Sequence, residues 1–245
     1  LPWMMGPDKG QLAEVATLNF GEDYMFLESS GTQRFLELTG NLPQPGAVTL
    51  AKKDFSWFAV FQFNASGYVK DDETLDPDTL LEQLQEGNRV GNQERKERGF
   101  PGLTLVGWYI PPRYDAQTKH LEWGTRLQSE GDSTDIANFT TRLLGRRGVM
   151  AATLVSEPAA LDHNAAEFKK VLRGFSFAAG ERYTEFRQGD KVAEYGLAAL
   201  IAGGAAAAVA KSGAGKALFK VLGVAAIAGL GVLGGLVRKL FSRKA

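Results

Sequence analysis

The sequence predicts an α+β fold, in which an antiparallel sheet is flanked by helices and followed by a C-terminal transmembrane helix. Segments with strand patterns cluster along the chain, and helical segments do not alternate regularly with them. Residues 221–237 form a run of seventeen uncharged, mostly apolar residues. Extending that run back to residue 217 gives about 31 Å of helix at 1.5 Å per residue, which matches a hydrocarbon core of roughly 30 Å.

The N-terminal quarter of the chain predicts two short strands and a short helix. Residues 14–20 and 25–28 have strand patterns and flank a Gly-Glu-Asp turn. Residues 32–38 have the apolar spacing of a helix. Pro43 to Gly46 then interrupt regular structure.

Residues 55–63 carry the strongest strand signal. β-branched and aromatic side chains occupy alternate positions on both faces, as expected for a central strand covered on both sides. A helix is predicted to begin directly after Asp76. Asp76 is a suitable N-cap, Pro77 fits the first helical position, and apolar residues follow at helical spacing.

The second half of the head predicts an antiparallel set of strands. We expect a strand over residues 103–110, ended by Pro111 and Pro112, because proline cannot donate to a sheet ladder. Residues 120–127 alternate between apolar and polar side chains, which indicates a half-buried strand.

A hairpin and a final helix complete the predicted head. Residues 136–144 and 149–155 have strand patterns and flank a Gly-Arg-Arg-Gly turn. Residues 158–173 have helical apolar spacing, and a Phe-Ser-Phe strand at residues 175–177 closes the domain.

The chain of 245 residues is long enough for one core plus an anchor. Its net charge of zero hides a division: the tail from residue 197 holds seven basic residues and no acidic ones, which leaves a net charge of −7 before it. An acidic head is a poor nucleic-acid binder. The predicted parts are a head (1–180), a polar juxtamembrane stalk (181–196), an Ala/Gly-rich helix with a basic turn (197–216), the transmembrane helix (217–237) and a basic cytoplasmic tail (238–245).

The charges beside the anchor predict its orientation. Four basic residues follow the apolar run, and basic flanks remain in the cytoplasm. We therefore expect a single-pass protein of the bacterial inner membrane, with its signal peptide removed and its head in the periplasm. If residues 197–210 also spanned the bilayer, the resulting hairpin would put the head in the cytoplasm. Fourteen residues reach only about 21 Å, which favours an interfacial or packed helix instead.

The residue types that usually perform catalysis form no recognisable catalytic arrangement in this sequence. We therefore expect no cofactor, and a binding protein is favoured over an enzyme. The chain has no Cys. Its two histidines, His120 and His163, belong to no recognisable motif, and His120 is expected at the surface. Residues 213–216 resemble part of a phosphate-binding loop but lack its first glycine and its Ser or Thr, and are interpreted as a juxtamembrane turn.

Three groups of residues remain as candidate sites. A dense acidic group could hold a hard cation, although its spacing does not fit an EF-hand and a solvated turn and helix N-terminus explains the same residues: Asp71, Asp72, Glu73, Asp76 and Asp78. Arginines on the predicted hairpin could bind an acidic partner, although hairpins often carry such charges for solubility: Arg142, Arg146 and Arg147. Small residues could pack membrane helices together and promote oligomers: Gly231, Gly235, Ala199, Gly203 and Ala207.

Several segments together resemble a bacterial family of uncharacterised membrane-anchored proteins (DUF2167). They are SGYVKDDE at residues 66–73, GWY at 107–109, PPRYD at 111–115, LEW at 121–123, TRLLGRRGVM at 141–150 and GDKVAEYGLAA at 189–199. The resemblance implies an exported, membrane-attached protein and brings no catalytic residue with it. The final strand, helix and Phe-rich strand are also weakly similar to Mog1/PsbP-like sandwiches, an analogy of fold and not of function.

These observations favour a membrane-anchored envelope protein whose head is a non-enzymatic binding or scaffolding module. Its expected partners are the lipid bilayer, further copies of the chain and a protein of the envelope. Two alternatives remain open: an envelope hydrolase that uses dispersed carboxylates, and a pore or membrane-remodelling assembly formed through the Gly/Ala-rich tail.

Overall fold

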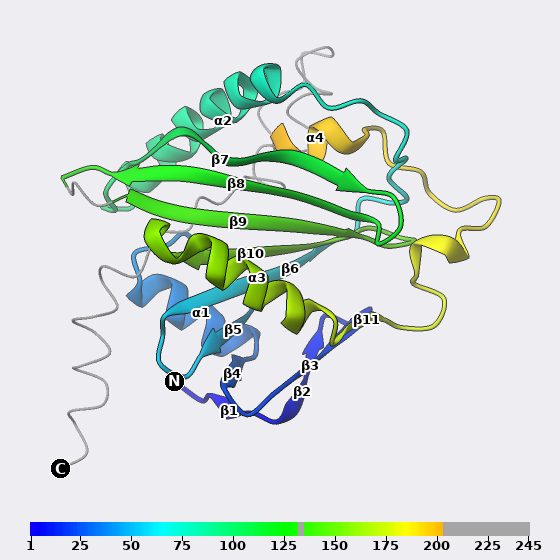
Figure 1. Cartoon of the computed structure of the whole chain (residues 1–245), viewed down its shortest axis with the longest axis horizontal. Helices are drawn as coiled ribbons and strands as arrows, with labels where there is room; N and C mark the ends of the chain where they lie inside the picture. The colour runs from blue at the N-terminus through cyan, green and yellow to red at the C-terminus, as the bar shows by residue number, and fades with distance from the viewer. Residues whose placement is uncertain (132–134, 203–245) are drawn as a thin grey trace.

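An eight-stranded antiparallel sheet organises the chain in the computed structural model, which describes residues 1–131 and 135–202 (Figure 1). From edge to edge its strands are β1 (Met4–Met5), β4 (Tyr24–Leu27), β5 (Val48–Lys52), β6 (Trp57–Asn64), β10 (Val149–Ser156), β9 (Asp135–Leu144), β8 (His120–Ser129) and β7 (Leu103–Asp115). A second sheet contains β11 (Phe175–Phe177), β3 (Ala16–Phe20) and β2 (Asp8–Leu12). The helices are α1 (Ser29–Leu38), α2 (Pro77–Glu97), α3 (Leu161–Leu172) and α4 (Leu197–Ala202).

The predicted α+β class with an antiparallel sheet is confirmed. β6 lies inside the large sheet, and β9 and β10 form the expected hairpin, with Leu144 opposite Val149. α2 begins where predicted, because the Asp76 carboxylate accepts a hydrogen bond from the backbone N–H of Thr79 at 2.9 Å.

The segments predicted as strands at residues 14–20 and 25–28 are β3 and β4, which lie in different sheets. One strand expectation needs correction. β7 does not end at Pro111 and continues to Asp115. It can pass the two prolines because it is an edge strand whose register with β8 shifts between Ile110 and Arg113, so the ladder needs no N–H donor there.

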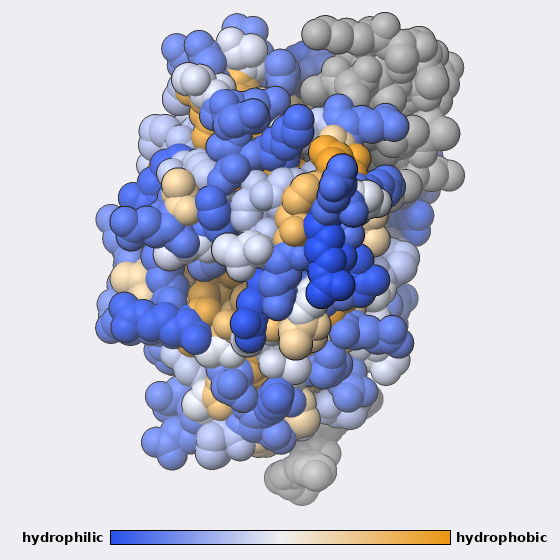
Figure 2. Space-filling view, turned by 90° about the vertical axis from the view of Figure 1, so that its right-hand side faces the viewer, coloured by the Kyte–Doolittle hydropathy of each residue, from blue (hydrophilic) through white to orange (hydrophobic). Residues whose placement is uncertain are grey.

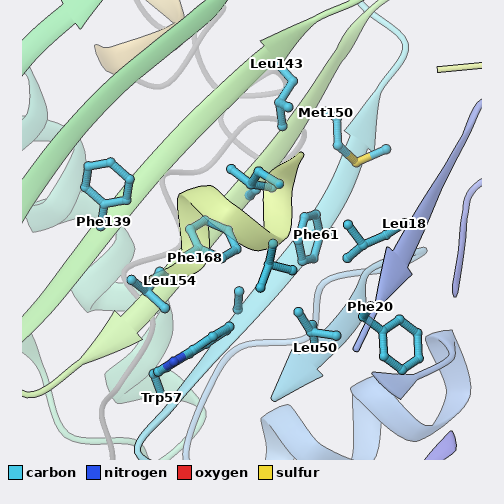
Figure 3. Close-up of a cluster of buried hydrophobic side chains, with 14 of the residues drawn as sticks. Leu18, Phe20, Leu50, Trp57, Phe61, Phe139, Leu143, Met150, Leu154 and Phe168 are labelled. Atoms are coloured by element: carbon cyan, nitrogen blue, oxygen red, sulfur yellow. The ribbon is translucent and has the colours of Figure 1, made fainter. Parts of the chain in front are cut away.

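One face of the large sheet packs against α3 and the small sheet. Phe168 of α3 lies on this face beside Trp57 and Phe61 of β6, with ring centroids 5.8 and 6.0 Å apart (Figure 3). Leu18 and Phe20 of the small sheet belong to the same buried cluster. These contacts hold the two sheets and α3 together as one core.

The opposite face is covered by two separate sets of helices. α1 covers the β5–β6 part of the sheet, where Phe35 meets Phe58 at 5.0 Å between ring centroids. α2 and α4 cover the β7–β8 part, over Leu121, Trp123 and Leu127 (Figure 1). The middle of this face, on β9 and β10, therefore lies between two apolar clusters.

The segment expected to be a polar stalk, residues 181–196, lies along the head in the structure. The Tyr183 ring stacks on Tyr68 with centroids 4.3 Å apart, and its hydroxyl donates to the carbonyl of Val69 at 2.9 Å. A parallel bridge also joins Tyr68 to Val192. The end of the molecule shown in Figure 2 is mostly hydrophilic, with hydrophobic residues visible between.

α4 continues this packing. Leu197 and Ile201 are fully buried, and the Glu73 carboxylate accepts a hydrogen bond from the backbone N–H of Ala198 at 2.9 Å. Ala199, a residue of the predicted small-residue surface, is also buried here. Within residues 1–131 and 135–202 no helix has the length and apolar character needed to span a bilayer. The predicted span and the other small residues lie outside the described residues: 217–237, Gly203, Ala207, Gly231 and Gly235.

Candidate ligand pocket

A small cavity with a mixed polar and apolar lining is present on the face of the large sheet, between the clusters under α1 and α2. Its volume is about 50 Å³. We call it the sheet-face pocket. Its lining comes from four neighbouring strands, from β7, from α2 and from the loop after α1: Gln44, Val60, Gln62, Leu84, Asn88, Leu105, Trp123, Thr125, Leu127, Asn138, Thr140, Arg142, Ala151 and Thr153.

The floor of the pocket follows from the two-residue repeat of β9. Asn138, Thr140 and Arg142 are alternate residues, so their side chains leave the same face of the sheet. Thr140 pairs with Thr153 on β10 and with Trp123 on β8. The neighbouring strands therefore extend the polar floor on one side and bring an indole ring to it on the other.

The walls are fixed by side-chain amides that hold loops and strands in place. On one side, the Asn88 oxygen accepts a hydrogen bond from the backbone N–H of Leu105 at 3.0 Å, which attaches α2 to β7. On the other, the Gln62 amide donates to the carbonyl of Pro45 at 2.9 Å. Gln33 and Gln44 exchange two further hydrogen bonds between α1 and the loop that follows it. These hydrogen bonds fix the backbone segments that surround the cavity.

Arg142 is the residue that distinguishes this pocket. Its guanidinium carbon lies 5.5 Å from the centroid of the Trp123 ring. Its Nε is buried without a hydrogen-bond partner. Among the described residues, no carboxylate and no hydrogen-bond acceptor neutralises its charge. Burial lowers the pKa of Arg142 to about 10, although the nearby phenol of Tyr195 opposes that shift.

The arrangement suits recognition of a small polar or anionic group. Amide and hydroxyl side chains provide hydrogen bonds, and the unpaired guanidinium adds a fixed positive charge in a partly enclosed site. Concave sites with a few convergent polar groups are typical of ligand binding.

Arg146 and Arg147, the other two arginines expected to bind a partner, have carboxylate partners within the chain. Arg146 donates two hydrogen bonds to Asp190, at 2.6 and 2.7 Å. These bonds lower the pKa of Asp190 to about 2. Arg147 pairs with Glu181 and donates from Nε at 2.8 Å. Both pairs fasten residues 181–190 to the β9–β10 turn, so these charges have a structural role.

The five acidic residues do not converge on one point. Asp71 accepts hydrogen bonds from the Tyr114 hydroxyl at 2.6 Å and from Lys119 at 2.8 Å. Burial alone would raise its pKa, but these bonds outweigh burial and the pKa of Asp71 is lowered. Glu73 bonds the start of α4, Asp76 caps α2, and Asp72 and Asp78 are exposed. In the part of the chain that the structure describes, no three His, Asp or Glu side chains are grouped to hold a metal ion.

The two histidines lie apart from the sheet-face pocket. His163 is exposed on α3. His120 is half-buried, not at the surface as expected, and burial lowers its pKa. It lines a wider cleft of about 680 Å³ between the β7–β8 hairpin and α3. Glu122 in that cleft is already paired with Arg113 at 3.0 Å and with Lys169 at 2.6 Å.

Of the residues that line the pocket, the sequence singled out Arg142 alone as a candidate, as one of three arginines on the predicted hairpin. A signal was present: three polar side chains occupy successive alternate positions of β9, which predicts that they lie on one face of the strand. The pattern alone does not reveal that α1 and α2 cover the regions on either side and leave this part of the sheet face uncovered.

Comparisons with known proteins give a family and weak similarities of fold. A family model described as "Protein of unknown function (DUF2167)" matches residues 5–234. None of the curated proteins matches the chain. The solution structure of cyanobacterial PsbP (CyanoP) from Synechocystis sp. PCC 6803 has a TM-score of 0.42 and 11% identity, over 70% of this chain and 92% of that one.

The crystal structure of the Ran-binding protein Mog1p from Saccharomyces cerevisiae has a TM-score of 0.41 and 6% identity. The match covers 75% of this chain and 100% of that one. The expected weak similarity to Mog1/PsbP-like proteins is therefore confirmed. Similarity at this level carries no argument about what the chain binds.

Proposed function

We propose that this chain, which belongs to the DUF2167 family of proteins of unknown function, is a membrane-anchored, non-enzymatic binding protein. The recognition site of its head is the sheet-face pocket. The single observation that carries this assignment is the unpaired guanidinium of Arg142 in this cavity.

The cost of Arg142 to the fold supports this role. A partly buried cation loses the favourable free energy of its hydration, and Arg142 has no carboxylate among the described residues to compensate for it. Stacking on Trp123 offsets only part of that loss. An apolar residue at position 142 would fill the same space at lower cost. A costly charge that faces a cavity is more easily understood as part of a binding site than as part of the core.

The membrane anchor rests on the apolar run at residues 217–237 and on the basic residues that follow it. We place the head in the periplasm of a bacterium and the tail in the cytoplasm. Packing of Leu197 and Ile201 in the head supports a single span over the hairpin alternative, because residues committed to the head core do not also cross a bilayer. Self-association through Gly231 and Gly235 is part of the same proposal.

Ligand binding at the pocket is tested by filling it. Ala151 lines the cavity, so Ala151→Leu places three extra carbon atoms there. Ala65 is exposed, and Ala65→Leu is the matched control. The full-length protein in detergent is titrated with small polar amides and acids by calorimetry. We expect at least one compound to bind the wild type and the control and to lose binding in Ala151→Leu. Equal binding by all three proteins would place recognition elsewhere.

Protease added to intact spheroplasts tests the topology. The periplasmic assignment predicts that trypsin digests the head, with its many Lys and Arg residues, while a cytoplasmic control protein survives. Protection of the head until the membrane is permeabilised would support the two-span alternative.

A further inference from the structure

We propose that the sheet-face pocket recognises a carboxylate group at the end of its ligand, held by the guanidinium of Arg142. This inference rests on the proposed function and adds the chemical class of the ligand. Charge, size and geometry lead to it separately.

The charge of the lining selects a singly charged anion. Arg142 is the one charged side chain among the residues that line the cavity, and all the others are polar or apolar. A carboxylate would neutralise it one for one. A phosphate dianion would bring a second negative charge into a partly enclosed site with nothing to balance it, which is unfavourable.

The volume limits the part of the ligand that enters. A water molecule needs at least about 10 to 15 Å³ of such space, so a cavity of about 50 Å³ holds roughly three to five atoms of that size. A carboxylate with its adjoining carbon chain fits this limit. The remainder of a larger ligand would extend beyond the cavity.

The geometry favours a planar group. Trp123 covers the guanidinium of Arg142, which restricts the plane in which it presents its N–H groups. The two oxygens of a carboxylate match two parallel N–H donors of arginine. The hydroxyls of Thr140 and Thr153 are hydrogen-bonded to each other at 3.5 Å on the floor, so the hydroxyl that accepts this bond keeps its own O–H as a donor for a ligand oxygen.

The test compares a carboxylate with its neutral isostere. Propionate, propionamide and inorganic phosphate are titrated by calorimetry into the full-length protein in detergent at constant ionic strength. We expect propionate to bind and the other two to bind at least about tenfold more weakly, since a charge-assisted bidentate pair is the strong form of this contact. Arg142→Met and Arg142→Lys should each weaken propionate at least about tenfold, because Lys keeps the charge and loses the planar fork.

Arg89→Met is the matched control, since Arg89 is an exposed arginine of α2 outside the pocket. It should bind propionate as the wild type does. The unfolding temperature of each variant shows that it is folded. A blocked tripeptide with a central glutamate distinguishes the sources: tighter binding than propionate indicates an acidic protein segment, and weaker binding indicates a free small acid.

The titrations distinguish a wrong ligand class from a pocket that binds nothing. If propionamide binds as tightly as propionate and Ala151→Leu abolishes both, the pocket is a binding site but the carboxylate assignment is overturned. Tighter binding of phosphate than of propionate also overturns it. If none of the probes binds, or if Arg142→Met binds propionate normally, the carboxylate site is absent.

Discussion

Arg142 lies over the ring of Trp123 across the β8–β9 pair, with its guanidinium carbon 5.5 Å from the ring centroid and its Nε buried without a partner. Both residues line the sheet-face pocket, which lies between two apolar clusters. This contact holds a positive charge in one orientation without neutralising it. A site prepared in this way suits recognition of an anion more than it suits stability.

Replacing that charge should stabilise the head. We expect Arg142→Met to raise the free energy of unfolding by about 1 to 3 kcal/mol. Methionine has a similar length and is apolar, so the cost of keeping an unpaired cation out of water is removed. Urea denaturation followed by circular dichroism measures the change. Arg89→Met, at an exposed site, should stay within about 0.5 kcal/mol of the wild type. A large loss of stability in Arg142→Met would mean that the guanidinium serves the fold.

The Glu167 carboxylate should be among the most important polar groups of the core. It accepts hydrogen bonds from the Tyr24 hydroxyl at 2.8 Å, the Trp57 indole at 3.1 Å and Lys52 at 3.2 Å. Glu167→Ala leaves these donors without their acceptor, so we expect the free energy of unfolding to fall by about 2 to 4 kcal/mol. Glu86→Ala, on the exposed face of α2, is the control variant. A similar fall in the free energy of unfolding in both variants would show that Glu167 contributes no more than an exposed glutamate.

The ion pair of Arg146 with Asp190 should make the packing of residues 181–190 depend on acid. The native pKa of Asp190 is about 2, below the value of about 3.9 for an unfolded chain. The stabilisation is therefore complete above about pH 4 and is lost as the pH falls towards 2. Hydrogen exchange of this segment, corrected for intrinsic rates, should rise over that interval.

Asp190→Asn is the control for this pH dependence. It should give faster exchange at neutral pH and remove most of the change between pH 4 and pH 2. An unaltered profile in Asp190→Asn would assign the acid sensitivity to another group, such as Glu185, whose pKa is also lowered.

α4 should be part of the head and not of the anchor. Ile201 is fully buried against the cluster under α2. We expect Ile201→Ala to lower the free energy of unfolding of the head by about 2 to 4 kcal/mol, through lost burial and the cavity left behind. Val90→Ala, at an exposed position of α2, should have little effect. If both variants unfold like the wild type, α4 does not contribute to head stability.

Much of the fold could be predicted because local patterns and tertiary environment agree. Apolar residues on both faces of β6 match its central position, and Asp76 and Pro77 mark the start of α2. β2 was missed because its sequence, DKGQL, has few apolar side chains, and only Gly10 and Leu12 are buried. β7 was expected to end early because a sequence does not show which strand lies at an edge, where prolines are tolerated.

The pocket was harder to predict for a related reason. The alternation of Asn138, Thr140 and Arg142 is visible in the sequence, but an exposed strand face would show the same pattern. Whether such a face meets water, a helix or a cavity depends on where α1 and α2 come to lie, and those helices come from distant parts of the chain. The partners of Arg146 and Arg147 were hidden for the same reason, because Asp190 and Glu181 lie more than thirty residues away.

The most direct test of the pocket is the ¹⁵N resonance of the Arg142 Nε–H group in the full-length protein. Burial protects this proton from exchange with water, and its signal is assigned by its absence in Arg142→Lys. We expect propionate to shift the signal in a saturable way and propionamide to leave it in place. A signal that stays in place at high propionate concentration, or that moves equally with both compounds, would contradict the assignment of this pocket as a carboxylate-binding site.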